Sequence, residues 1–434
     1  MLPASPGSGF KVRSARAIRQ GEWGSLSQQS FDWLVHMSTL PLSPAAHQAD
    51  WEYRITLILW TCCALSIVFI IVVPTIPAVI FLGAVLLYCA LFPARPYQAM
   101  TWSFVPWVIV LLGALSAIWS VQPVQSVRAA AQIALSVLAA LMFAQNLRAR
   151  SFIATIMFAF IASNIVYLFV PSVFGSKNMV AQSLAIVILS GFWVVFDRQQ
   201  PAIVRLIALV ALVAAPPMLL SAHSEGALLA GSLALACSLV PYLMRRLHPN
   251  TRIFLVCFGA FAGTVAVVFL LLLFDNLFDL LLQSIGKDVS LTGRTLLWDH
   301  ALGVIADHPF GVGLQAYWND SNIDAVRFWE TFYINNHYGF HFHDLWLETG
   351  VELGVIGIVI AAATTLIVFF SVWRWALQNP RPESCFFAGF VTFILARTLG
   401  EVELYAQFSM TSMLFLAAYY YAESTTRRSS LPKA

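Results

Sequence analysis

The sequence predicts an all-α polytopic membrane protein with about twelve transmembrane helices, and three observations support this fold class. Of the 434 residues, 59% are hydrophobic and only 10% are charged. The mean hydropathy is +0.78. Apolar runs of about 20 residues, the length that a helix needs to cross a bilayer, follow one another along the chain. A water-soluble domain carries about a quarter of charged residues, so this composition excludes a soluble fold.

Charge and cysteine usage exclude further classes. The net charge of +3 is too small to indicate nucleic acid as a partner. The six cysteines lie inside or at the ends of apolar runs without a CxxC pair, so we expect neither disulfides nor a thiolate metal site. Basic residues near the N-terminus are not followed directly by an apolar stretch, as they are in a signal peptide. We therefore expect residues 1–52 to form a cytoplasmic arm.

Nine spans are expected within 53–274 and three within 345–421, followed by a cytoplasmic tail over 422–434. Their approximate limits are 53–73, 76–92, 102–119, 129–147, 152–171, 179–196, 202–220, 225–243, 253–274, 345–371, 386–404 and 405–421. Only Pro74 and Pro77 divide the first pair. The last pair is interrupted by charged residues, which are Arg397, Glu401 and Glu403.

The distribution of Lys and Arg predicts the orientation of these spans. With the N-terminus inside, the inner segments hold 17 basic residues and the outer segments hold 5. Cytoplasmic loops collect positive charge, so both termini are expected in the cytoplasm. One segment, 275–344, is much longer than the other loops and is then periplasmic. Loops of this length in a compact protein are usually functional, so we expect a catalytic loop here.

Arg294 is the first candidate in the long loop. It follows Gly293 and precedes an apolar, aromatic stretch, which predicts a short amphipathic helix at the membrane surface. An arginine can hold a diphosphate with two parallel hydrogen bonds, which a lysine does less well. The alternative is an interfacial arginine whose charged end simply reaches water.

Three histidines, His337, His341 and His343, precede the tenth span and are followed by Asp344. A neutral imidazole at the membrane boundary is well suited to act as a general base. Two alternatives stay open on the residues alone. His337, His341 and Asp344 have a spacing that fits a zinc site, or the histidines are ordinary polar loop residues.

Other polar residues are candidates for contacts with an anionic substrate. Lys177 follows a tight turn at a predicted helix N-terminus, where backbone N–H groups also favour a phosphate. Arg128 and Arg327 are further cations on the outer side. Glu348 and Glu352 share one face of the tenth span, and we favour a structural role for Glu352 over orientation of a catalytic histidine. For each cation the alternative is a side chain that faces solvent.

Four motifs taken together indicate a family. They occur in the order WSVQPVQSVRAA, GSKNMVAQSLA, LTGRTLLWDHALGVIADHPFGVGLQAYW and GFHFHDLWLETGVELGVIG. In this order they resemble the superfamily of O-antigen ligases and Wzy-type polysaccharide polymerases, and the stretch 292–357 is most similar to ExoQ-type exopolysaccharide polymerases. The resemblance extends from about residue 110 to 360, and only the whole set is specific.

The resemblance implies a GT-C-like glycosyltransferase in the bacterial inner membrane. Its donor would be an undecaprenyl-diphosphate-linked glycan, its acceptor a glycan or a lipid-linked glycan, and it would use no metal or other cofactor. By position, Arg294 matches the arginine that contacts the diphosphate, His343 matches the essential histidine proposed as base, and Lys177 matches the basic residue of the KN segment. His341, Asp344 and Glu352 are expected beside them, at the substrate.

Two positions depart from the family pattern. Asp344 stands where an asparagine is usual, so it either raises the basicity of His343 or caps the following helix. Glu225 stands where many members have a cation. The second basic contact to the diphosphate would then come from Lys177, Arg128 or Arg327.

The favoured function is polymerisation of lipid-linked repeat units with inversion at the anomeric carbon. An O-antigen ligase that transfers the glycan to lipid A-core is the nearest alternative, because it shares the donor and the histidine. A polysaccharide transporter is a third interpretation, in which the charged residues of the last pair of spans line a path through the membrane. On the glycosyltransferase interpretation, replacing Glu401 is expected to leave transfer nearly intact.

Overall fold

A computed structural model describes residues 44–70, 75–170, 176–273, 293–335, 337 and 339–430. Within these ranges the regular elements are helices, without a strand. The chain divides into two compact units, Met1–Glu52 and Tyr53–Ala434, and the helical bundle belongs to the second.

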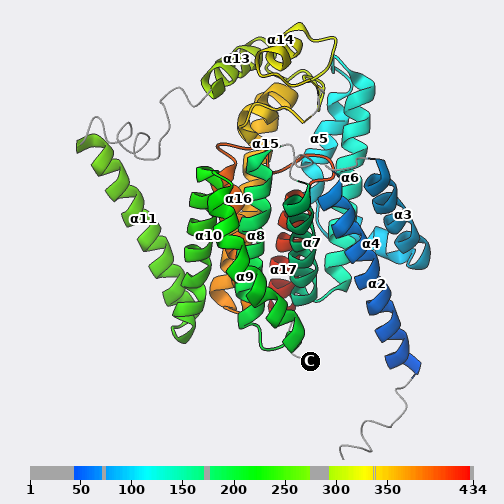
Figure 1. Ribbon diagram of the computed structural model, residues 1–434, viewed down its shortest axis with the longest axis vertical. Coiled ribbons are helices and arrows are strands. Elements are labelled where there is room, and N and C mark those ends of the chain that lie inside the picture. Colours follow the sequence, from blue (N-terminus) through cyan, green and yellow to red (C-terminus); the bar gives the residue numbers. More distant parts are fainter. Residues whose placement is uncertain are drawn as a thin grey trace, which may run out of the picture. The chain divides into compact units, whose positions relative to one another are not determined.

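The helices follow one another in a single series along the chain (Figure 1). The first part contains α2 (Pro44–Phe69), α3 (Thr75–Leu91), α4 (Ala94–Trp102), the 3₁₀ turn η1 (Val105–Trp107), α5 (Val108–Ser116), α6 (Pro123–Asn146), α7 (Ala149–Phe169) and α8 (Lys177–Phe196). The middle contains α9 (Ala202–Ser221), α10 (Glu225–Leu243), η3 (Met244–Arg246) and α11 (Pro249–Leu273). The remainder contains α13 (Arg294–Asp307), α14 (Ile323–Thr331), α15 (Leu345–Gln378), α16 (Pro382–Arg397) and α17 (Met410–Ser430).

Seven of the described helices are long and apolar enough to cross a membrane, or eight if α3 and α4 together form one bent span. The chain is therefore a multi-pass membrane protein. Each of the twelve predicted spans overlaps a described helix, but the count of twelve crossings stays a prediction.

The predicted third span, 102–119, is not one membrane-length helix. Its apolar helical part, Val105–Ser116, rises only about 18 Å, against the roughly 30 Å of a bilayer core. The preceding α4 is bent by 104° from α3, so the chain turns sharply before this short helix begins. Pro106 lies in the 3₁₀ turn that precedes α5, where its missing N–H costs no helical hydrogen bond.

The predicted eleventh span, 386–404, is also wrong at its end. The helix α16 stops at Arg397, and α17 begins only at Met410. Glu401 and Glu403 therefore lie in the connection between two helices and not inside a span. Their carboxylates accept hydrogen bonds from side chains elsewhere in the fold, which stabilises this irregular backbone.

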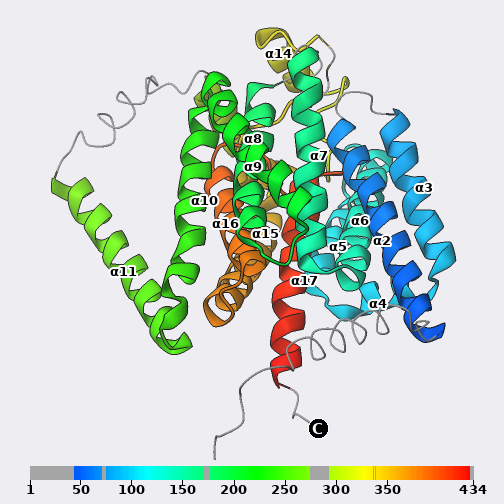
Figure 2. The same cartoon turned by 60° about the horizontal axis from the view of Figure 1, so that its bottom comes forward.

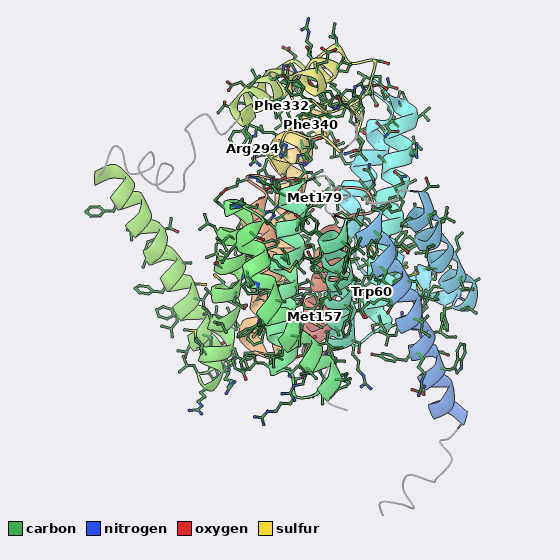
Figure 3. All side chains as sticks on the ribbon, in the orientation of Figure 1. Trp60, Met157, Met179, Arg294, Phe332 and Phe340 are labelled. Atoms are coloured by element: carbon green, nitrogen blue, oxygen red, sulfur yellow. The ribbon has the colours of Figure 1, made fainter. Side chains whose placement is uncertain are left out.

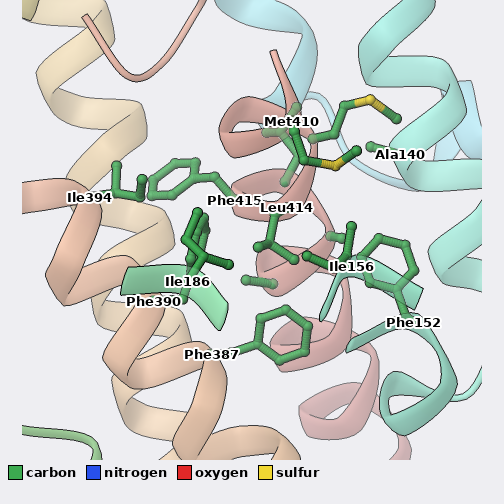
Figure 4. Close-up of a cluster of buried hydrophobic side chains, with 14 of the residues drawn as sticks. Ala140, Phe152, Ile156, Ile186, Phe387, Phe390, Ile394, Met410, Leu414 and Phe415 are labelled. Atoms are coloured by element: carbon green, nitrogen blue, oxygen red, sulfur yellow. The ribbon is translucent and has the colours of Figure 1, made fainter. Parts of the chain in front are cut away.

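The helix α17 lies at the centre of the bundle, with neighbouring helices on several sides (Figures 1 and 2). Leu414 and Phe415 of α17 are fully buried in a cluster with side chains of α7, α8 and α16 (Figure 4). These partners include Phe152, Ile186 and Phe390. Lipid tails are as apolar as these side chains, so close packing between the helices stabilises this cluster, which holds the helices that carry the polar residues described below.

The helix α15 has a kink, and residues 309–313 of the long loop pack against it. Gly354 has φ 69° and ψ −166°, which is non-helical and divides this 34-residue helix. The kink leaves backbone groups without helical partners, and the loop satisfies them: Val355 N–H donates to the Pro309 carbonyl (3.0 Å), and Gly313 N–H donates to the Glu352 carbonyl (2.9 Å). A side chain at Gly354 would collide with the backbone of Pro309 and Phe310, and one at Gly311 with the backbone of Glu352, which explains a glycine at both positions.

The turn between α5 and α6 holds the other side of the loop. The indole N–H of Trp119 donates to the Phe310 carbonyl (3.0 Å), and the Ser126 hydroxyl donates to the Leu314 carbonyl (2.9 Å). The WSVQPVQS motif therefore anchors the loop. Above this anchor, α13 and α14 pack on a second apolar cluster that includes Trp329 and Phe342.

Candidate active site

Glu401, in the connection after α16, is the centre of a polar cluster. Its Oε1 accepts hydrogen bonds from Asn178 Nδ2 (2.6 Å) and Arg294 Nη2 (3.0 Å). Its Oε2 lies 3.4 Å from His343 Nδ1 and 3.8 Å from His341 Nε2. The Glu401 cluster therefore joins residues from three separate parts of the chain to one carboxylate.

The beginnings of four helices meet at this cluster. Arg294 is the first residue of α13, and Asn178 is the second residue of α8. Ser224, the residue before α10, donates to Asn178 Oδ1 (2.9 Å). His343 lies two residues before the start of α15. Figure 3 shows Arg294 and Met179, which label the starts of α13 and α8, on the side of the bundle where α15 begins.

The two histidines are held in place by the residue between them. Phe342 is fully buried, and its N–H donates to Glu348 Oε2 (2.8 Å). Its carbonyl accepts a hydrogen bond from the indole of Trp298 on α13 (3.0 Å). With Phe342 buried, the flanking His341 and His343 both reach Glu401. The backbone of His343 has φ 55°, a left-handed conformation that ends the loop just before the helix begins.

Local hydrogen bonds indicate which nitrogen of each histidine carries a proton. The N–H of His343 donates to Nδ1 of His341 (3.0 Å), so the proton of the neutral His341 ring is on Nε2, facing Glu401. The Nδ1 of His343 faces the Glu401 carboxylate, which places its proton there as a donor. The Nε2 of His343 then keeps a lone pair that can accept a proton.

Charge and burial act in opposite directions on the Glu401 cluster. Burial and the neighbouring His343 lower the pKa of His341 to about 3, so this ring is neutral at physiological pH. Burial raises the pKa of Glu401. The hydrogen bond from His343 and the nearby positive charge, which includes that of Arg397, outweigh burial and lower this pKa to about 2. The cluster thus holds one fixed negative charge beside the guanidinium of Arg294.

The donor atoms of His341, His343 and Glu401 lie within 4.8 Å of one another, a set that resembles a metal site. The hydrogen bonding disfavours this use. Coordination through His341 Nε2 requires its proton to move to Nδ1, which already accepts the His343 N–H. The zinc set considered from the sequence is not formed, because His337 instead hydrogen-bonds to Asp320 (2.7 Å).

A second, more buried ion pair lies next to this cluster. Arg397 donates to Glu403, and Gln182, one turn along α8 from Asn178, donates to the same carboxylate. The side chains of Arg397 and Glu403 are only 5% and 3% exposed, against 24% and 14% for Arg294 and Glu401. Because solvent barely reaches the second pair, we assign it to the fold rather than to the site.

The structure brings together three of the residues selected from the sequence, Arg294, His341 and His343. Asp344 does not pair with His343. Its carboxylate accepts the N–H groups of Trp346 and Leu347 (2.8 and 2.9 Å) and so caps α15, which was one of its two predicted roles.

The acids of the tenth span have structural partners. Glu352 accepts from the side-chain amide of Gln315 (2.9 Å) and lines a small cavity. Glu348 accepts from the Trp318 indole (3.0 Å) in addition to the backbone of Phe342. Glu352 is thus bonded to a side chain of the long loop, and its structural role stays a prediction.

The remaining predicted cations are not joined to the Glu401 cluster. Lys177 is exposed at the start of α8, and its neighbour Asn178 makes the contact instead. Arg128 is exposed on α6. Arg327 is 69% exposed and pairs with Asp324 of its own helix (3.4 Å). Within the described residues, neither arginine forms an ion pair with the cluster.

Glu401 and Asn178 are site residues that sequence reasoning missed. Asn178 lies in the KN motif, but only its neighbour Lys177 carries the charge that predicts a contact with an anion. Glu401 was assigned to a span and considered only for transport. The expectation that its replacement leaves transfer nearly intact conflicts with its central position, and we withdraw it. The signal that could have found it was a carboxylate directly after an apolar run, where a polar partner is required.

Comparisons with known proteins agree with the motifs. Residues 210–362 match the O-antigen ligase family, a stretch that includes Arg294 and His343 but not Glu401. The chain is 32% identical over 199 residues to the exopolysaccharide production protein ExoQ of Rhizobium meliloti (strain 1021). That match spans 45% of each protein, which is less than half of the relative's length. The matched stretch is thus similar to the O-antigen ligase family and to an ExoQ protein, in agreement with the motifs.

Proposed function

We propose that this protein is a metal-independent, inverting membrane glycosyltransferase that polymerises undecaprenyl-diphosphate-linked repeat units on the periplasmic face of the inner membrane. The observation that carries the proposal is the contact of one carboxylate, Glu401, with both Arg294 and His343. It brings a cation for a diphosphate and a base for a hydroxyl to one place.

The base is His343. The hydroxyl of an acceptor sugar is a poor nucleophile and benefits from a group that takes its proton during attack. With Nδ1 directed at Glu401, the ring is oriented and its Nε2 is free to accept that proton. The carboxylate also stabilises the positive charge that forms on the ring, as the acid does in a serine protease triad.

The donor side of the reaction needs charge stabilisation more than an acid, because a lipid diphosphate is already a good leaving group. Arg294 has five N–H donors in a planar fork, and its bond to Glu401 occupies one of its nitrogens. The starts of α8, α10, α13 and α15 add the positive ends of helix dipoles. Such an environment favours a phosphate group at the cluster.

The reaction balances without a further reactant. The acceptor oxygen forms a bond to the anomeric carbon, and the bond from that carbon to the phosphate oxygen breaks. The hydroxyl proton passes to His343 Nε2, and the lipid diphosphate leaves with the bonding electrons. Direct displacement on one face of the sugar inverts its configuration.

Two other functions remain as outcomes of the experiment. A ligase would use the same residues and give the glycan to lipid A-core. The transporter interpretation relied on Arg397, Glu401 and Glu403 as a path within spans. It loses support because the two acids lie outside the helices and all three side chains have partners.

The purified protein, as wild type and His343→Ala, is incubated with a lipid-diphosphate-linked repeat unit alone, and the products are resolved by size. The proposal predicts a ladder of products from the wild type, its loss in the variant, and full activity in the presence of a chelator. Loss of activity in the chelator that zinc restores would contradict metal independence. Products formed only when lipid A-core is added identify a ligase, and no product with either acceptor contradicts the proposal.

A further inference from the structure

Two aromatic side chains lie between the residues proposed to act on the glycan. The rings of Phe332 and Phe340 are 5.5 Å apart at an angle of 34°. The Phe340 ring is 6.0 Å from the ring of His343. Phe332 lies against the start of α13, since a Cβ at Gly293 would come within 2.8 Å of its ring. The pair thus reaches His343 at one end and the neighbour of Arg294 at the other (Figure 3).

The aromatic pair packs against other aromatic side chains and is itself only partly buried. Phe332 stacks on Phe328 of α14 (6.4 Å, 22°), and Phe340 packs against the edge of Trp318 (5.0 Å, 89°). Phe328 is buried, whereas both rings of the pair are only half-buried. The rings are therefore held in fixed positions by the second apolar cluster while part of their surface stays accessible.

At the start of α13, the absence of a side chain at Gly293 leaves space for the Phe332 ring. Gly293 has φ +85°, a conformation that side chains rarely adopt, and any side chain there would strike the ring. The glycine therefore allows the ring to lie directly beside the first turn, next to the guanidinium-bearing residue. This close approach keeps the aromatic pair continuous with the Glu401 cluster.

We propose that the Phe332–Phe340 pair is the platform on which a sugar ring of the acceptor glycan stacks, an inference that rests on the proposed function. A hexose ring has an apolar face of C–H groups and a polar edge of hydroxyls. Aromatic rings bind the apolar face, and the hydroxyl edge stays available to polar groups. We assign the acceptor and not the donor, because Phe340 contacts the histidine that takes the acceptor's proton.

The test separates acceptor from donor. The donor is the lipid-diphosphate-linked repeat unit extracted from cells that lack this gene, and its KM is measured at a saturating concentration of the alkyl acceptor so that it does not compete as an acceptor. The acceptor is the same repeat unit attached to a short alkyl chain, which can accept a glycan but cannot donate one because it has no diphosphate. Phe332→Leu and Phe340→Leu remove a ring and keep an apolar side chain, and Phe340→Tyr keeps the ring. Phe310→Leu is the matched control, because Phe310 is 61% exposed in the same loop beyond the other end of α13.

Each Leu variant is expected to raise the KM for the alkyl glycoside roughly three- to tenfold, the range that one aromatic contact supports. The donor KM and kcat should stay within about twofold, and Phe340→Tyr and Phe310→Leu should behave as wild type. Binding of the alkyl glycoside to His343→Ala protein, which does not turn over, should weaken by the same factor when Phe332→Leu or Phe340→Leu is added.

Several results would overturn the platform. An unchanged acceptor KM in both Leu variants would do so, as would equal changes in donor and acceptor KM or a drop in kcat alone, which indicate a packing role. The two positions are tested separately, so that a variant that fails to fold leaves the other as the test. If the wild type transfers no glycan, the proposed function itself fails, whereas a working wild type with unaffected variants contradicts only the platform.

Discussion

Glu401 and Glu403 lie two residues apart in the connection between α16 and α17, and their side chains have different surroundings. Glu401 meets Asn178 of α8 and the arginine of α13, and its side chain is 14% exposed. Glu403 meets Gln182, one turn further along α8, and Arg397 of the preceding helix, and is 3% exposed. Two similar carboxylate–arginine pairs are thus placed side by side, one next to histidines and partly accessible, the other closed.

The difference indicates two roles for one segment. The pair of Arg397 and Glu403 ties the end of α16 to α8 and so fixes the backbone from which Glu401 projects. The pair of Arg294 and Glu401 connects a helix of the loop to this fixed backbone and stays partly exposed. On the proposed function, the partly exposed pair belongs to the chemical site and the buried pair to the fold, and substitutions should separate these two roles.

The largest effect on activity is expected for His343→Ala. Removal of a general base lowers the rate of a reaction by about 10²–10⁴-fold, and we expect about 10³-fold in glycan transfer. The unfolding temperature in detergent should stay close to that of the wild type, because the ring is only partly buried. His337→Ala serves as the control and should keep its activity, since that ring pairs with Asp320 outside the cluster. Equal activity in both variants would show that His343 is not the base.

Arg294→Lys is expected to lower the transfer rate by about 10²-fold. A lysine keeps the positive charge but not the planar fork that can hold Glu401 and a phosphate together. Initial rates at saturating donor measure the effect, with Arg327→Lys as a control on an exposed arginine of the same loop. Near-normal turnover of Arg294→Lys would mean that the residue serves only to hold α13 in place.

Arg397→Ala tests the role of the buried ion pair between Arg397 and Glu403. Loss of one partner leaves a buried carboxylate without its cation, which costs roughly 3–5 kcal/mol of folding free energy. We expect a lower unfolding temperature and a smaller yield of folded protein, while the rate per folded molecule stays within a few-fold of wild type. An unchanged unfolding temperature would contradict the assignment of this pair to the fold.

The smallest effect is expected for His341→Gln. Burial and His343 hold the pKa of His341 near 3, so the ring gains its proton only when the pH falls towards that value. Between pH 5 and 8 it does not change charge, and the shape of the pH–rate profile should be the same with and without it. A shift of the acid limb in this range in His341→Gln would show that this ring, and not only its neighbour, titrates during turnover.

The sequence predicted most of the helices, because apolar runs report directly on a bilayer. The sequence-based prediction was wrong where a few polar contacts determine the path of the backbone. The run 386–404 is apolar enough to be read as a span, yet the chain leaves the helix at Arg397 because the polar side chains that follow find partners on α8 and α13. The groups freed by the kink at Gly354 likewise bond to a loop some 40 residues away, which no periodicity within α15 can show.

The candidate site was predictable in part. Arg294 and His343 were found because their motifs occur together in one family and because each residue type fits a step of the reaction. Glu401 was not, because it lies about 60 residues after the histidine, outside the stretch that the family shares. Arg128 and Arg327 were selected for their charge alone, and charge does not determine which side chains the fold brings together.

The most direct test measures Glu401→Gln and Glu403→Gln side by side for the rate of glycan transfer per folded molecule and for the unfolding temperature. Opposite outcomes are expected for the two variants. Glu401→Gln loses about 10–100-fold in rate, as for loss of a residue that orients a functional histidine, and unfolds near the wild-type temperature. Glu403→Gln unfolds at a clearly lower temperature and keeps its rate. Full activity of Glu401→Gln, or equal losses of activity and stability in both variants, would contradict the division of this segment into a chemical and a structural carboxylate.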